Sequence, residues 1–316
     1  MTRAPLVWGG AAAAIIGLGG LALGLAIATT ATAADHVQRY LDALARDDLV
    51  AAAQLAGLEP PTAMPLGDEG EPSIHRIVST EPAPDGTVTV VAEYGAGADA
   101  VRVPFRLEPA PPTFGFVPRW AFVDPPVARL SIAADQHDQF AANGRSVIAP
   151  GAGEPVSVAA FMPARVTVRI TDPLLRAEPV TVRAGAEGSA AIELVVMPSE
   201  RFTRIVEREI EHLLDGCAEQ PVLQPTGCPF GITIVDRVTT PPVWQLESAP
   251  DVIVEPGDAP GVWLVRGTGA VRLTVSVQRL FDGTVAERDE QVGYIVRGDV
   301  VLGPDGPVLT VYPPGG

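Results

Sequence analysis

The most distinctive hydrophobic pattern of the chain is a stretch between Leu6 and Ala33 that contains no charged side chain. An α-helix rises 1.5 Å per residue, so about 20 apolar residues are enough to cross the hydrocarbon core of a bilayer. The stretch reaches that length. We therefore predict that residues 1–34 form a membrane anchor or signal segment, with residues 6–33 in contact with the lipid bilayer.

A cleaved secretory signal is the alternative interpretation of the same stretch. Arg3 precedes the apolar run, and Ala31-Thr32-Ala33 is a small-x-small site after which cleavage would leave Ala34 as the first residue. Signal peptides usually have about 7 to 15 apolar residues, so this longer run favours an uncleaved anchor. In both interpretations the rest of the chain is exported. The product is either a single-pass cell-membrane protein with its C-terminal bulk outside the cytoplasm or a secreted protein.

The next pattern consists of two short helices followed by strands. Asp35 is expected to cap a helix with one apolar stripe, and a second helix over residues 49–58 is expected to end near Gly57. Alternating runs then predict strands at 74–79, 87–94, 100–107 and 119–123. Helices followed by a curled antiparallel sheet indicate an α+β domain over residues 35–126.

This order of elements resembles the NTF2-like cone fold. The run YLDALARDDLVAAAQLAG at 40–57 looks like the opening helices of bacterial, actinobacterial-type membrane-anchored extracytoplasmic members of that family. Catalytic relatives carry acidic or histidine side chains inside the cone, and the candidates here are Asp42, Asp48, His75 and Glu93. None of them matches a catalytic motif of the family, and Asp42 is expected to face solvent on its amphipathic helix.

Residues 127–198 lack helical periodicity and contain short alternating runs. Val166, Val168 and Ile170, for example, alternate with polar residues as in a half-buried strand. The predicted strands are 128–132, 156–161, 165–171, 179–183 and 190–196. Asn143-Gly144 can form a turn. We predict a small β-sandwich-like module, whose FMPARVTVRI run looks like the β-domains that follow membrane anchors in actinobacterial surface proteins.

Residues 199–316 repeat the order of helix and then sheet. Ser199 begins a helix with Glu200 in its first turn, where a negative charge suits the helix dipole, and Gly216 is expected to end it. The predicted strands are 231–238, 243–247, 251–255, 262–266, 270–280, 290–297 and 308–312. We therefore predict a β-rich α+β chain: a transmembrane helix, an NTF2-like unit, a small all-β module and a second NTF2-like unit.

Charge and cysteine content add two constraints. The chain has 38 acidic and 22 basic residues and a formal net charge of −16, so it repels nucleic acid, which we exclude as a partner. Cys217 and Cys228 lie close together in sequence around a proline-containing loop. Export would oxidise this pair, and we predict a disulfide rather than a metal site or a catalytic thiol.

Three groups of residues have the composition of metal ligands without the required pattern. Glu209 and His212 have the i, i+3 spacing of metal-binding helices, but no second such motif exists, so a solvated helix face is expected. Two acidic clusters do not match a calcium loop and are expected to be solvated. They are Asp68, Glu69 and Glu71, and Glu287, Asp289 and Glu290.

The sequence contains no phosphate-binding loop, nucleophile elbow or Ser-x-x-Lys motif. We therefore predict no catalytic residue, no metal and no cofactor. The expected function is that of a non-enzymatic, membrane-anchored extracytoplasmic binding or scaffolding protein with an unknown protein or small-molecule partner. The alternatives are a small-ligand carrier or enzyme that uses a cone cavity, and a secreted soluble protein.

Overall fold

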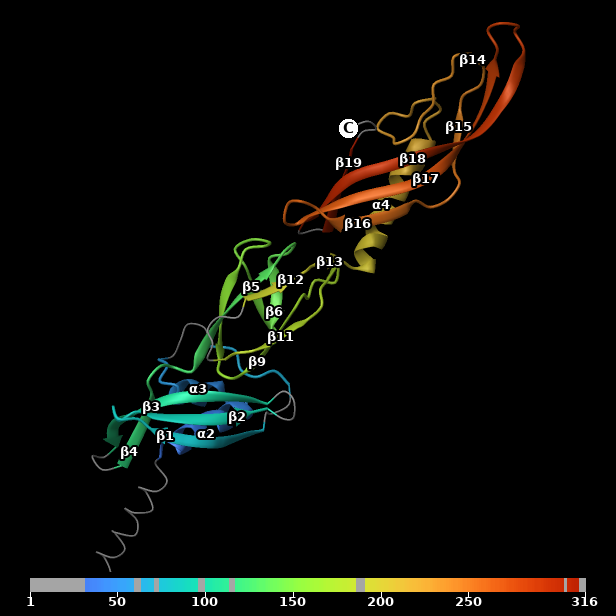
Figure 1. The fold of residues 1–316 in the computed structure, drawn as a ribbon. Coiled ribbons are helices and arrows are strands. Elements are labelled where there is room, and N and C mark those ends of the chain that lie inside the picture. The colour runs from blue at the N-terminus through green and yellow to red at the C-terminus, as the bar shows by residue number, and fades with distance from the viewer. Residues whose placement is uncertain are drawn as a thin grey trace, which may run out of the picture.

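The computed structural model describes residues 32–59, 64–70, 74–95, 100–113, 117–185, 191–303 and 306–312. Figure 1 shows three units in a row, which give the described chain an elongated shape. The chain has few helices and many strands, so the predicted β-rich α+β class is confirmed. The apolar residues 6–31 lie outside the described residues, and none of the described helices is both long and apolar enough to cross a membrane.

The first unit consists of two helices packed on an antiparallel sheet. The helices are α2 (Ala33–Ala45) and α3 (Leu49–Leu55). The sheet has the order β1 (His75–Pro82), β2 (Val88–Tyr94), β3 (Val101–Thr113) and β4 (Val117–Phe122). Because each strand pairs with the next one in the chain, the sheet is a simple meander that α2 covers.

The start of α2 corrects the predicted capping residue. Thr32 is the N-cap, and its hydroxyl oxygen accepts a hydrogen bond from the backbone N–H of Asp35 at 3.1 Å. The carboxylate of Asp35 in turn accepts from the backbone N–H of Thr32 at 3.0 Å, which completes a capping box. Asp35 is therefore the third residue of the helix and not its cap.

Aromatic side chains fill the core of the first unit. The buried Tyr40 of α2 packs edge-on against Phe105 and Phe122 of the sheet, with ring centroids 6.0 and 5.3 Å apart. Such edge-to-face pairs combine a large apolar area with favourable ring geometry. Tyr40 also packs against Phe161, which belongs to the second unit, so this core continues across the boundary between the units.

The second unit consists of two small sheets. One has the order β11 (Val180–Arg183), β9 (Arg165–Arg169), β6 (Gln139–Ala142) and β7 (Arg145–Ile148). The other has the order β12 (Ala191–Leu194), β5 (Val127–Ala134) and β8 (Val156–Phe161), with β12 and β5 parallel. A short pair, β10 (Leu175–Arg176) and β13 (Met197–Pro198), leads to the third unit.

The β6–β7 hairpin was not predicted, although its turn residues were. Asn143 and Gly144 have φ values of 47° and 74°, the left-handed conformation that a two-residue hairpin turn requires. Each strand is only four residues long, and β6 ends in two alanines, so alternation was too short to indicate it.

The third unit packs α4 (Glu200–Ala218) on a six-stranded sheet. The strands are β14 (Arg237–Val238), β15 (Val243–Leu246), β16 (Asp251–Pro256), β17 (Val262–Gln278), β18 (Val285–Gly303) and β19 (Gly306–Val311). The first three all pair with β17, which pairs along its whole length with β18. This long β17–β18 hairpin projects at the far end of the molecule from α2 (Figure 1).

Three element predictions in this unit were wrong. The helix does not end at Gly216 but continues to Ala218, because the buried Leu214 and Cys217 hold its last turn against the core. The expected strand at 231–238 is reduced to Arg237–Val238. The two expected strands at 262–266 and 270–280 are one continuous strand, β17.

Glycine explains the continuity of β17. A side chain at Gly269 would meet the hydroxyl of Tyr294 at 2.3 Å, so the glycine makes room for the tyrosine of the paired strand. The residue therefore serves cross-strand packing instead of breaking the strand.

Candidate functional site

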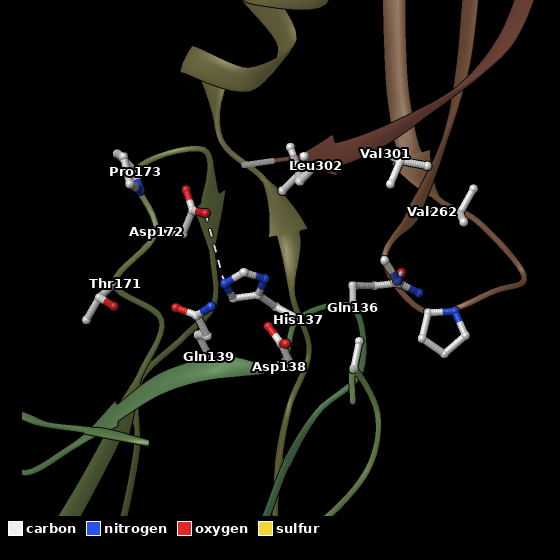
Figure 2. Close-up of a pocket in the computed structure, with 14 residues that line it drawn as sticks. Gln136, His137, Asp138, Gln139, Thr171, Asp172, Pro173, Val262, Val301 and Leu302 are labelled. Carbon is white, nitrogen blue, oxygen red and sulfur yellow. Dashed lines mark hydrogen bonds and ion pairs between the residues drawn. The ribbon is translucent and has the colours of Figure 1, made fainter. Parts of the chain in front are cut away.

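A cleft lies between the second and third units. Its volume is about 660 Å³, within the range of small-ligand sites. The second unit contributes residues 136–139, Ala152 and 171–173, and the third unit contributes residues 260–262 and 301–303. Figure 2 shows the two walls facing each other.

Gln136 connects the two walls. Its side-chain carbonyl accepts a hydrogen bond from the backbone N–H of Gly261 at 2.9 Å, and its amide donates to the backbone carbonyl of Gly257 at 3.4 Å. Both backbone groups belong to the loop between β16 and β17. One side chain of the second unit therefore holds a loop of the third unit at the edge of the cleft.

The wall of the second unit is polar. Nε2 of His137 lies 4.0 Å from Oδ2 of Asp172, the contact that the dashed line in Figure 2 marks. Oδ1 of Asp172 accepts a hydrogen bond from the backbone N–H of Leu174 at 2.8 Å, which fixes the carboxylate. Asp138, Gln139 and Thr171 add further carboxylate, amide and hydroxyl groups.

The wall of the third unit is apolar. It consists mainly of Val262, Val301 and Leu302, and Val301 is 48% exposed. A cleft with one polar and one apolar wall suits a small amphipathic molecule or a side chain of a partner protein. Among the described residues, no group of three or more histidine, cysteine, aspartate or glutamate side chains could hold a metal ion.

The structure brings together two of the four candidates in the first unit. Nε2 of His75 lies 2.8 Å from Oδ1 of Asp42, whose side chain is 39% exposed, and Gln38 donates to the same oxygen at 3.2 Å. Asp42 therefore contacts a histidine and does not simply face solvent as expected. The other two candidates lie elsewhere: Asp48 caps α3, and Glu93 is on β2.

The carboxylate of Glu93 is held by two arginine side chains. Arg76 donates to it at 2.8 Å and Arg102 at 3.3 Å, and these hydrogen bonds hold the pKa of its carboxyl below the ordinary value. A carboxylate held by two arginines on a sheet surface is a stable anion. Glu93 is therefore suited to pair with these two arginine side chains and not to exchange protons.

A network around Tyr94 was missed by the sequence analysis. The ring of Tyr94 stacks on His75 with centroids 6.1 Å apart, and its hydroxyl donates to Asp68 at 3.0 Å. The other oxygen of Asp68 accepts from the backbone N–H of Arg165 at 2.6 Å. Arg183 lies over the same ring at 5.6 Å. The network links the first unit to the second, because Arg165 and Arg183 belong to β9 and β11.

The remaining acidic candidates are solvated or paired. Glu209 and His212 are exposed on α4. Glu69 pairs with Arg169, Asp289 with Arg272 and Glu290 with Arg288, whereas Glu71 lies outside the described residues.

The structure joins Cys217 and Cys228 in the disulfide that their spacing predicted. The bridge ties the end of α4 to the loop that follows, and both cysteines are buried. This loop also carries Phe230, which packs on Trp244 at 5.0 Å between centroids, and Val222, whose carbonyl accepts a hydrogen bond from the Trp244 indole. The disulfide thus fixes the irregular segment that covers the sheet.

The residues of the cleft gave no signal in the sequence. They come from five separate segments, and each segment is a loop or the end of a strand. Only the packing of the second unit on the third brings them together.

Comparisons of the chain with protein-family models, with curated proteins and with solved structures found no match.

Proposed function

We propose that the protein is a membrane-anchored extracytoplasmic binding or scaffolding protein without enzymatic activity. The single observation that carries this proposal is the continuous packing across both boundaries between the three units. A chain whose units are joined in this way can hold a binding surface at a fixed distance from its anchor. The anchor itself rests on the uncharged residues 6–31, because Thr32 and Ala33, which were also predicted to contact the bilayer, cap and begin α2.

The first boundary depends on Tyr40. Its hydroxyl lies 3.1 Å from the backbone carbonyl of Pro126 and 2.7 Å from that of Met162, so it is positioned to donate to both. Burial raises the pKa of the Tyr40 phenol well above its ordinary value, which keeps the proton available for these contacts. A buried hydroxyl that satisfies backbone carbonyls of the next unit opposes bending at this boundary.

The second boundary depends on an apolar core and on backbone hydrogen bonds. One hydrophobic cluster extends from Phe140 in the second unit to Phe202 and Trp263 in the third. The backbone N–H of Ser199 donates to the carbonyl of Leu174 at 2.9 Å, so the start of α4 is tied to the segment next to the cleft. Two units that share a core are expected to move together.

An NTF2-like origin of the first and third units is part of this proposal. The order of helices followed by an antiparallel sheet supports it for the first unit, and α4 followed by the six-stranded sheet supports it for the third. The resemblance to actinobacterial-type extracytoplasmic proteins remains an interpretation of the sequence pattern.

A small-ligand carrier is the second candidate function, and the cleft lined by His137 and Asp172 is the observation that favours it. The cone of the first unit favours it less, because Tyr40, Phe105 and Phe122 fill its core. A carrier would therefore use the boundary between two units and not a cone cavity.

Membrane fractionation combined with intact-mass analysis tests the anchor. We expect the full chain in the membrane fraction, starting at Met1 or Thr2, with residues beyond 34 accessible to protease only from outside the cytoplasm. A soluble chain that starts at Ala34 would contradict anchoring and support secretion.

Mass spectrometry of small molecules released by denaturing the full-length protein tests the carrier function. The comparison variant is Val301→Trp, which places a large side chain in the cleft. A molecule present in the wild type and absent from this variant would support a carrier. An identical profile for both proteins would leave binding or scaffolding as the better account.

A further inference from the structure

The long strand β18 has an open edge along most of its length. Its C-terminal residues 298–303 pair with β19, and its whole length pairs with β17 on the other side. In the part of the chain that the structure describes, no strand pairs with residues 285–296 on the side away from β17. An open edge presents unpaired backbone groups to other chains.

The hydrogen-bond pattern shows which residues point to this edge. The carbonyl of Arg297 accepts from the backbone N–H of Tyr312, which follows β19, whereas the carbonyl of Thr284 accepts from Arg279 beside β17. The pairing of β17 with β18 has no register shift. Because residues alternate along a strand, Val285 and every second residue as far as Ile295 direct their N–H and C=O groups to the open edge.

We propose that a second copy of the chain pairs with this edge, so that two β18 strands run antiparallel about a two-fold axis at Asp289. In this register Val285 faces Gly293 of the other copy, and Glu287 faces Gln291. The exposed Gly293 leaves room for the valine, because a side chain built on it would meet only the carbonyl of Gly269, at 3.9 Å. The two sheets become one continuous sheet.

Charge complementarity supports this register. Arg288 faces Glu290 of the other copy, and the two-fold axis forms this pair twice on the same face of the sheet, next to the ion pair of 2.9 Å that the two side chains form within each chain. The only like-charged pair is Asp289 with its own copy. Each Asp289 is already compensated by Arg272, whose Nη1 lies 2.8 Å from its carboxylate.

The tip of the hairpin supports the same partner. Leu280 and Phe281 are 69% and 99% exposed, yet the turn that carries them is fixed by hydrogen bonds from Leu280 to Asp236 and from Thr284 to Asp282. In the antiparallel register the tip of one copy extends toward Ile295 of the other, which is 52% exposed. Pairing therefore brings apolar side chains of the two copies together at both ends of the interface.

A cysteine cross-link tests the register directly. In the full-length protein in detergent micelles, Asp289→Cys places two cysteines in a hydrogen-bonded antiparallel pair, with Cα atoms about 5.5 Å apart, within disulfide range. We expect a covalent dimer under mild oxidation. Thr274→Cys is the matched control, because Thr274 lies opposite Asp289 on β17, one strand further from the axis. Equal cross-linking of both variants, or of neither, would overturn the register.

Two further variants test the edge without relying on new cysteines. Gln291→Pro removes an N–H that points to the open edge and not to β17, so the hairpin is expected to fold and the protein mass in the micelle to fall from dimer to monomer. Arg288→Glu should weaken dimerisation at least tenfold, and the charge swap Arg288→Glu with Glu290→Arg should restore it.

A wild-type monomer at about 100 μM, or a dimer that survives Gln291→Pro with its circular dichroism unchanged, contradicts the proposal.

Discussion

The two boundaries between units differ in how completely they are closed. At the first boundary, Tyr40 and Phe161 are fully buried, and the tyrosine hydroxyl reaches two carbonyls across it. At the second boundary a shared core lies beside an open cleft, and the side chain of Gln136 bridges its edge. The comparison indicates that the first boundary is fully closed, whereas the second shares a core and also leaves room for a ligand beside it.

Removing the aromatic ring of Tyr40 should have the largest effect. Tyr40→Ala creates a cavity at the first boundary and is expected to lower the free energy of unfolding by about 3 to 5 kcal/mol. Tyr40→Phe keeps the ring and should cost about 1 to 2 kcal/mol, because the Met162 carbonyl loses its donor whereas the Pro126 carbonyl keeps the backbone N–H of Met162. Denaturant titration measures both. Equal values for the two variants would show that the ring does not close the boundary.

Breaking the disulfide should have the next largest effect and should be confined to the third unit. The double variant Cys217→Ser, Cys228→Ser removes the constraint on the loop and is expected to cost about 2 to 3 kcal/mol in the chain-entropy model. Hydrogen exchange should rise at the end of α4 and in the loop around Phe230. A comparable rise around Tyr40 would contradict the view that the first boundary is independently closed.

Removing the bridge across the cleft should cost less. Gln136→Ala deletes two hydrogen bonds at a partly buried site and is expected to lower the free energy of unfolding by about 1 kcal/mol. The exchange rate of the Gly261 amide should increase, since that amide donates to Gln136. Gln139→Ala is the matched control, because Gln139 is exposed and lines the same cleft. Equal exchange rates of the Gly261 amide in both variants would show that Gln136 does not bridge the edge of the cleft.

The smallest expected effect is a pH dependence at the first unit. His36 is buried against Phe122 and contacts the Leu55 carbonyl at 3.0 Å through Nε2, and burial lowers the pKa of its imidazole. The unfolded state then binds the proton more readily, so this stability is fully present above about pH 6.5 and is lost as the pH falls through the folded-state pKa.

Unfolding measured between pH 7.5 and 5 checks this prediction. His36→Gln should flatten the decrease in stability at acidic pH, whereas His212→Gln on the exposed face of α4 should leave it unchanged. If the free energy of unfolding decreases equally in the wild type, His36→Gln and His212→Gln, the pH dependence belongs to other groups.

Periodicity predicted most helices and strands because each buries one face along its length. The α2 and α4 helices and the strands β5, β8 and β15 fall close to the expected residues. Prediction failed where long-range packing opposed local propensity. Glycine at 216 did not end α4, because the buried Leu214 and Cys217 on either side of it hold the last turn against the core. Gly269 of β17 accommodates Tyr294 instead of interrupting the strand.

The candidate site could not be predicted for a different reason. The contact between His137 and Asp172, and the apolar side chains opposite them, come from segments that only the tertiary structure brings together. The contact of Asp42 with His75 is similar, because the two residues are 33 positions apart and only the folded unit brings them into contact. The disulfide could be predicted because its two cysteines are close in the chain and no others compete.

The capping box at Thr32 and Asp35 has a consequence for maturation. If a peptidase cuts after Ala33, the mature chain loses both the cap and the first residue of α2, and its new ammonium group lies at the positive end of the helix dipole. Loss of the cap costs about 0.5 to 2 kcal/mol, and the misplaced charge adds to it. Processing at this position would thus release a less stable protein than the one that keeps its apolar segment.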